Sequence, residues 1–162
     1  MTAHLTLRNR QRSRLVRLDR LRRCVQHLLA ETVPHARVDL GIHLVGAAEM
    51  ARINARFLGH AGATDVITFD YADPADRKAG LALLGEILVC VDEAVTQARR
   101  FRTTWTSELA RYIIHGLLHL EGFDDHRPAA RQRMKREEDR RLRALARGFV
   151  LNTLAADTTL RP

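Results

Sequence analysis

The chain has few of the residues on which several common classes of protein depend. Only two of its 162 residues are cysteine, and 5% are aromatic. Two cysteines exclude a disulfide-rich secreted scaffold, so Cys24 and Cys90, each among apolar neighbours, are expected to be buried thiols of a cytoplasmic protein. The scarcity of aromatic side chains argues against a platform on which the bases of single-stranded nucleic acid stack.

Several longer patterns are missing as well. No run of 18 or more apolar residues occurs, so we expect no segment that spans a membrane. The N-terminal residues have no apolar core, which excludes an ordinary secretory signal. There is no glycine-rich phosphate loop and no internal repeat. With 46% hydrophobic residues, the chain is expected to form one domain over residues 1–148, followed by a loose tail over residues 149–162.

Charge of one sign dominates the chain. Lysine and arginine together number 27 against 19 acidic residues, and the formal net charge is +8. Eight arginines lie between Arg8 and Arg23, where Asp19 is the only acidic residue. Such a surface is expected to contact the phosphates of a nucleic acid. Of the basic residues 25 are arginine, a skew that a GC-rich genome alone could also produce.

The spacing of apolar residues predicts an α+β fold. We expect a small, mostly four-stranded mixed sheet packed with about five helices, one of which is central and binds metal. The predicted strands are a first one around Leu5–Leu7 and those at 37–45, 64–69 and 83–91. The predicted helices are 15–32, 47–58, 92–101, the metal helix that begins at 106 or 107, and 128–148.

The strongest chemical signal lies between Arg111 and His126. Apolar residues recur there at helical spacing, and His115 and His119 are four residues apart, so their imidazoles project from one face of a buried helix. Gly122 ends the helix, and the chain then turns back and delivers a third imidazole or carboxylate. Two histidines and such a third ligand are what a catalytic zinc site needs, with its fourth position open.

The position after the first histidine is Gly116. Zinc proteases of the H-E-x-x-H type carry their general base there, so peptide hydrolysis by that mechanism is disfavoured, although the expected arrangement of ligands is metzincin-like. A metalloprotease therefore stays only as a weak alternative. A second carboxylate, Glu86, interrupts an apolar strand, and a charge there is costly unless it is paired or faces a site. We predict that Glu86 assists as an acid or base near the metal, with a structural hydrogen bond as the alternative.

Three blocks of sequence resemble one known family. His115-Gly116-Leu117-Leu118-His119-Leu120, followed by Gly122-Phe123-Asp124 and a histidine, is similar to the H-G-x-L-H-L-x-G-Y-D-H signature of the YbeY-like metal-dependent endoribonucleases, the bacterial rRNA maturation factors. Thr64-Asp65-Val66-Ile67-Thr68-Phe69 resembles the family's T-D-V-L-S-F, and Leu84-Gly85-Glu86-Ile87 resembles its L-G-D-I. The likeness covers roughly residues 5 to 147.

The resemblance implies a zinc-dependent endoribonuclease, specific for single strands, that acts in ribosomal RNA maturation and ribosome quality control. It implies one Zn²⁺ per chain and, as partners, RNA, in particular ribosomal RNA and the small ribosomal subunit. The site residues expected on these grounds are, as metal ligands, His115, His119 and His126, with His115 also catalytic beside Glu86, and, as contacts to the substrate, Asn54, Arg56, Thr64 and Asp65.

The sequence departs from the family pattern at two places. Six residues instead of five separate His119 from His126, so Asp125 stands in the expected register. We favour His126 as the third ligand because imidazole is the commoner one, and Asp125 is the alternative because zinc also accepts carboxylates. Leu58 stands where the family carries an arginine, and Arg56 lies two residues earlier. An RNA- or ribosome-binding assembly factor with a structural metal and little catalysis is therefore the main alternative function.

Overall fold

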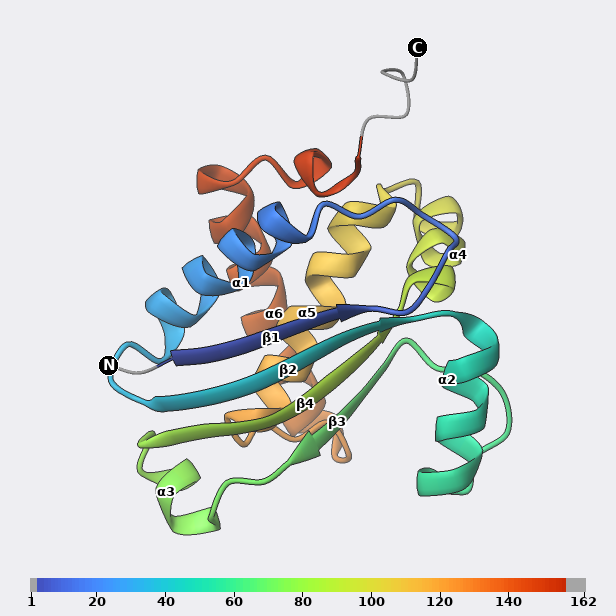
Figure 1. Ribbon diagram of the computed structural model, residues 1–162. Coiled ribbons are helices and arrows are strands. Elements are labelled where there is room, and N and C mark those ends of the chain that lie inside the picture. Colours follow the sequence, from blue (N-terminus) through green and yellow to red (C-terminus); the bar gives the residue numbers. More distant parts are fainter. Residues whose placement is uncertain (1–2, 157–162) are drawn as a thin grey trace.

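The fold is a mixed four-stranded sheet with helices on both faces, in a computed structural model that describes residues 3–156 (Figure 1). The strand order is β1-β2-β4-β3, in which β1, β2 and β4 are parallel and β3 is an antiparallel edge strand. The α+β prediction is thereby confirmed. In chain order the elements are β1 (Ala3–Asn9), α1 (Leu18–Thr32), β2 (Arg37–Val45), α2 (Ala47–Ile53), the π-helical turn η1 (Asn54–Leu58), β3 (Val66–Asp70), α3 (Pro74–Lys78), β4 (Ala82–Cys90), α4 (Val91–Phe101), α5 (Trp105–Leu120), α6 (Pro128–Gly148) and the 3₁₀ helix η2 (Leu151–Leu154).

The main core lies between one face of the sheet and the helices α1, α5 and α6. Strand β2 contributes alternate side chains to it, since Val38, Leu40, Ile42 and Leu44 are buried while Asp39 is exposed. Helix α1 crosses over the sheet between the parallel strands β1 and β2, as such a connection requires. It begins at Leu18 and not at residue 15, because Arg17 is extended and Val16 forms a bridge with Ala155.

Helix α5 lies so close to β4 that only glycine fits at two contact points. A Cβ atom on Gly116 would lie 2.6 Å from Cγ2 of Ile87. One on Gly85 would lie 2.8 Å from Cδ2 of Leu120 and still closer to the carbonyl oxygen of Phe69 on β3. The residues 85 and 87 of β4 therefore face α5. The residue after the first histidine of the metal motif packs on the sheet, so it is unable to carry a base that reaches the site.

We expect Gly116→Ala to lower the free energy of unfolding by about 1–3 kcal/mol, the usual cost of overpacking a core. The matched control is Gly148→Ala at the end of α6, where the new methyl group would meet only ordinary contacts at 3.8 Å or more. Alanine there is expected to be neutral or mildly stabilising. Urea unfolding measures the free energy of unfolding of both variants. Equal values would contradict the close packing of α5 on β4.

The opposite face of the sheet is only partly covered. Helix α2 packs there on a smaller apolar cluster that includes Met50, Leu88 and Cys90. Both Cys24 and Cys90 are buried free thiols, as predicted, and burial raises the pKa of Cys24 to about 12. Within residues 3–156, every helix is too short or too polar to pass through a lipid bilayer.

Residues 149–156 are packed against the domain, so the prediction of a loose tail is wrong for them. Leu154 is fully buried, Phe149 and Leu151 lie against the main core, and Thr106 donates a 3.0 Å hydrogen bond to Asn152. Apolar residues in a short 3₁₀ turn follow neither the helical nor the strand period, which explains the error. The rest of the predicted tail, residues 157–162, lies outside the described residues.

An ion pair joins α6 to the end of α5. The guanidinium of Arg141 donates two hydrogen bonds, of 2.7 and 2.8 Å, to the two carboxylate oxygens of Glu121, the residue that caps α5. Both side chains are largely buried, where a bidentate pair is strong and its geometry is fixed. The end of α5, from which the next loop departs, is thereby held in place.

Candidate metal centre

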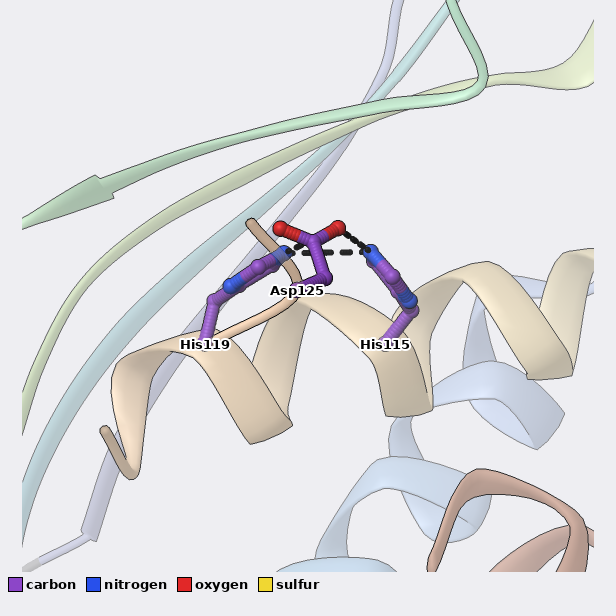
Figure 2. Close-up of side chains that lie close together, drawn as sticks. All are labelled: His115, His119 and Asp125. Atoms are coloured by element: carbon purple, nitrogen blue, oxygen red, sulfur yellow. Dashed lines mark hydrogen bonds and ion pairs between the residues drawn. The ribbon is translucent and has the colours of Figure 1, made fainter. Parts of the chain in front are cut away.

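Three side chains with metal-binding atoms meet at the C-terminal half of α5 (Figure 2). Nε2 of His115 and Nε2 of His119 are 3.1 Å apart. Oδ2 of Asp125, from the loop after α5, lies 3.7 Å from the first nitrogen and 3.6 Å from the second. The helix presents both imidazoles because they are one turn apart, and Gly122, at a φ of 100°, lets the chain reverse toward them.

Each histidine is held through its other ring nitrogen. Nδ1 of His115 lies 2.9 Å from the carboxylate of Glu138 on α6, and Nδ1 of His119 lies 3.2 Å from the carbonyl oxygen of Phe123. Both partners are acceptors, so Nδ1 of each ring carries a proton and donates it. In the neutral rings, Nε2 is then an unprotonated acceptor. Two such acceptors that face each other at 3.1 Å repel each other unless a proton or a metal ion lies between them.

The donor set fits a divalent transition-metal ion. Adjacent ligand atoms of a tetrahedral zinc site with bonds of about 2.0–2.1 Å lie roughly 3.3 Å apart. The three separations of 3.1, 3.6 and 3.7 Å bracket that value. Two imidazoles and one carboxylate form a set that zinc accepts, and other first-row divalent metals also bind such ligands.

The surroundings of the two histidines shift their pKa values in opposite directions. Burial opposes the charged form of His115, but the hydrogen bond and charge of Glu138 outweigh it and raise the pKa of that imidazole. Burial and the neighbouring His115 lower the pKa of His119. Burial alone would raise the pKa of Glu138, yet hydrogen bonds from His115 and Arg111 bring it down to about 2. Glu138 is therefore an anion that compensates for positive charge at the site.

His126, which we favoured as the third ligand, points away from the histidine pair. Its side chain is 90% exposed, and its Nε2 lies 3.7 Å from Asp124. The backbone N–H of His126 donates a 3.0 Å hydrogen bond to the Asp124 carboxylate, which fixes a turn that directs the imidazole outward. Of the two candidates, the structure brings Asp125 to the pair. The register of the family motif, in which Asp125 takes the place of the third ligand, agrees with this arrangement.

Glu86 lies on the wrong face of the sheet for the role that we predicted. Because Gly85 and Ile87 face α5, the side chain between them projects from the opposite face. There its carboxylate lies 3.2 Å from Nε2 of His43 and accepts a 3.0 Å hydrogen bond from the hydroxyl of Tyr71. The prediction that Glu86 assists near the metal is wrong, and the hydrogen bonds that we had kept as the alternative are present.

The four predicted substrate contacts lie in different places. Thr64 and Asp65 line a cavity that His115 also lines, and the Asp65 carboxylate accepts hydrogen bonds from Thr64 and from the backbone N–H of Val66. Asn54 is buried, and its amide donates a 2.9 Å hydrogen bond to the carbonyl of Gly62, so it closes the loop before β3. Arg56 is exposed, with its guanidinium 5.3 Å from the centre of the Phe57 ring.

Glu138 is a site residue that we did not predict. It lies on the buried face of α6, four residues from both Met134 and Leu142, and is only 6% exposed. A charged residue in the middle of an apolar stripe must have a buried partner, and this pattern was visible in the sequence. Its partners are His115 and Arg111, so it is the carboxylate that orients a candidate metal ligand.

We expect Glu138→Gln to weaken zinc binding by about 10- to 100-fold, the usual effect of removing a carboxylate that orients a histidine ligand. The matched control is the neighbouring Glu137→Gln, since Glu137 contacts Arg140 and Arg141 but no histidine. Competition with a chelating dye measures both affinities. An unchanged affinity of Glu138→Gln would contradict this role of Glu138.

The chain is similar to a set of bacterial proteins over most of its length. A sequence model of the family described as Endoribonuclease YbeY matches residues 6–146. The protein of that name from Chlorobium phaeovibrioides is 40% identical over 129 residues, which cover 80% of this chain and 82% of that protein. The one from Salinibacter ruber is 31% identical over 144 residues and covers 87% and 91%. The solution structure of TM1509 from Thermotoga maritima matches with a TM-score of 0.63 at 23% identity, over 97% of this chain and 99% of that one, and shows the same fold.

Proposed function

Because the chain belongs to the family of the YbeY endoribonucleases, we propose that it is a metal-dependent hydrolase that cleaves single-stranded RNA in the maturation of ribosomal RNA. The observation that carries this proposal is the convergence of His115, His119 and Asp125 on one point. We propose these three residues as the metal ligands, zinc as the ion, and one ion per chain. The exposed arginines of the N-terminal segment, such as Arg8, Arg10 and Arg12, support a polyanionic substrate.

The chemistry follows from the residues around that point. A bound divalent ion would supply a Lewis acid for the phosphodiester group. Glu138 and the Phe123 carbonyl hold the two imidazoles in one tautomer, so that their Nε2 atoms stay available as ligands. Asp125 adds a negative charge, which favours a cation at this place. Thr64 and Asp65, which directly precede β3, line the same cavity as His115 and are placed to contact a substrate there.

The setting in the cell is part of the proposal. Buried free thiols support a cytoplasmic location. The small ribosomal subunit would present the RNA, and cleavage of defective RNA there would serve ribosome quality control. The metzincin-like arrangement of ligands remains a prediction.

An assembly factor with a structural metal is the second candidate. It is favoured by Leu58, which is 49% exposed at the position of the family's arginine, and by Arg56, whose guanidinium rests on Phe57. Such a factor would bind RNA but would cleave little or none of it.

The experiment that separates the two uses metal-free protein to which zinc, manganese or magnesium is returned. We expect cleavage of a single-stranded RNA oligonucleotide to disappear on chelation and to return with zinc, and the matching duplex to resist. Fully metallated protein that binds the RNA but leaves it intact would support the assembly factor and reject the nuclease.

A further inference from the structure

A cavity of about 490 Å³ lies beside the metal centre and shares His115 with it. Its walls come from residues 63–65, just before β3, and from α4, α5 and α6, and its size falls within the range of small-molecule sites. Three of the lining residues, Glu93, Gln97 and Phe101, are four apart along α4 and therefore form one face of that helix. The proposed chemistry at the metal does not use them.

A buried hydroxyl in this cavity has no partner. Tyr112 is only 5% exposed, and its hydroxyl oxygen makes no hydrogen bond within residues 3–156. An unpaired buried hydroxyl destabilises a protein, so phenylalanine would be the better residue here if packing were the only requirement. The oxygen is closed to solvent in this structure, so a polar group of a bound molecule would become its partner after a small shift of the side chains in the cavity wall.

The cavity is rich in acceptors. Asp65, Glu93 and Glu108 contribute carboxylates, of which Asp65 already accepts from Thr64 and Val66 and Glu108 accepts from Thr103. The cation Lys135 is paired with Glu138 and Asp139, and Arg111 with these two and, at 4.0 Å, with Glu108. Among the described residues the side chains of Glu93 and Gln97 make no hydrogen bond or ion pair. A phosphate would be repelled here, and a molecule with N–H donors would be attracted.

A second metal ion is a poor occupant. In the part of the chain that the structure describes, the groups of side chains close enough to hold an ion are His115 with His119 and Asp125, and Asp124 with Asp125 and His126. None of the carboxylates of this cavity belongs to either group. Because these carboxylates are too far apart to hold one ion together, the cavity favours an organic molecule that spans the distance between them.

We propose that this cavity binds the guanine base of the RNA nucleotide next to the cleaved bond, an inference that rests on the proposed nuclease function. Guanine carries two neighbouring N–H donors, at N1 and N2, which match the two oxygens of the Glu93 carboxylate. Its O6 atom accepts from the hydroxyl of Tyr112 or the amide of Gln97. Phe101 is 61% exposed at the rim, and the guanidinium of Arg100 lies 5.3 Å from the centre of its ring, so the base would stack on the opposite face of the ring.

The test is a titration with the 5′-monophosphates of guanosine, inosine and adenosine, followed by NMR of the backbone and of the Gln97 amide. The three probes share one phosphate, and inosine lacks only the N2 amino group. We expect the guanosine nucleotide to bind at least about tenfold more tightly than the other two and to shift the signals of Glu93, Gln97 and Phe101. Equal binding of all three, or shifts confined to other residues, would overturn the proposal.

Two variants of the cavity and one control variant sharpen the test. Glu93→Gln should reduce the preference for guanine by about 5- to 150-fold, the range of a lost bidentate contact. Glu31→Gln on α1, an exposed position that makes the same change of charge, should keep it. Tyr112→Phe should retain or raise the melting temperature and weaken guanosine binding. An unchanged affinity together with a lower melting temperature would assign Tyr112 a purely structural role and reject its part in binding.

Cleavage mapping on oligoribonucleotides separates this proposal from the one on which it rests. Wild-type protein should cut beside guanine, and Glu93→Gln should cut without that preference. Cleavage with no preference in either protein rejects the base site and leaves the nuclease intact. Binding of the guanosine nucleotide without any cleavage of RNA rejects the nuclease and retains a guanine site.

Discussion

Asp125→Ala is expected to lose nearly all bound zinc, whereas His126→Ala is expected to retain the metal content of the unchanged protein. The carboxylate of Asp125 lies 3.6 and 3.7 Å from the two histidine nitrogens, but the imidazole of His126 is 90% exposed and turned away. Removal of a direct ligand should weaken affinity by at least the roughly 100-fold that the loss of an orienting residue can cause. Elemental analysis of the purified proteins measures the difference.

The two neighbouring alanine variants control for each other, because both change the same loop. Asp125→His is a third informative variant, since an imidazole there should restore part of the affinity if position 125 faces the metal. Loss of zinc in His126→Ala with retention in Asp125→Ala would reverse our assignment of the third ligand and restore the preference drawn from the sequence.

His119→Ala is expected to abolish RNA cleavage while the protein stays folded. The ligands act as one unit, so removal of one should lower the rate by at least about a thousandfold. His119 is the better choice for this test than His115, because its ring contacts only a backbone carbonyl outside the site. The loss of His115 would leave the buried Glu138 without one of its partners.

Gel analysis of a labelled oligonucleotide measures the rate, and circular dichroism checks the fold. Glu31→Gln on α1, outside both the ligand set and the cavity beside it, should keep the wild-type rate. Cleavage by His119→Ala at the wild-type rate would show that the activity does not depend on this metal centre.

The elements with a strong period could be predicted from the sequence. Strand β2 follows its alternation from Arg37 to Val45, and α6 begins at Pro128 and ends at Gly148, both as expected. These patterns arise because one face of each element is buried, and the spacing of apolar residues in the sequence reveals that face directly. The turn at Leu151–Leu154 has no such period, so its packing became visible only in three dimensions.

The candidate site was predictable in part for a related reason. The spacing of His115 and His119 fixes their relative position because both lie on one helix. For Glu86 the strand pattern indicated a polar residue with a partner, but not the face on which that partner lies. Asp125 and His126 are adjacent in a loop, where no period determines which of them turns inward. Glu138 comes from a different helix, and its pairing with His115 depends on how α5 and α6 pack.

Helix α6 provides no side chain to the candidate metal centre, but it holds α5 in place through two separate contacts. Glu138 fixes the ring of His115, and the bidentate pair between Arg141 and Glu121 fixes the point from which the loop to Asp125 departs. We therefore expect metal affinity to be adjustable through residues that are not themselves ligands. A variant library confined to the inner face of α6 should yield proteins that keep the same three ligands but hold the ion with graded strength.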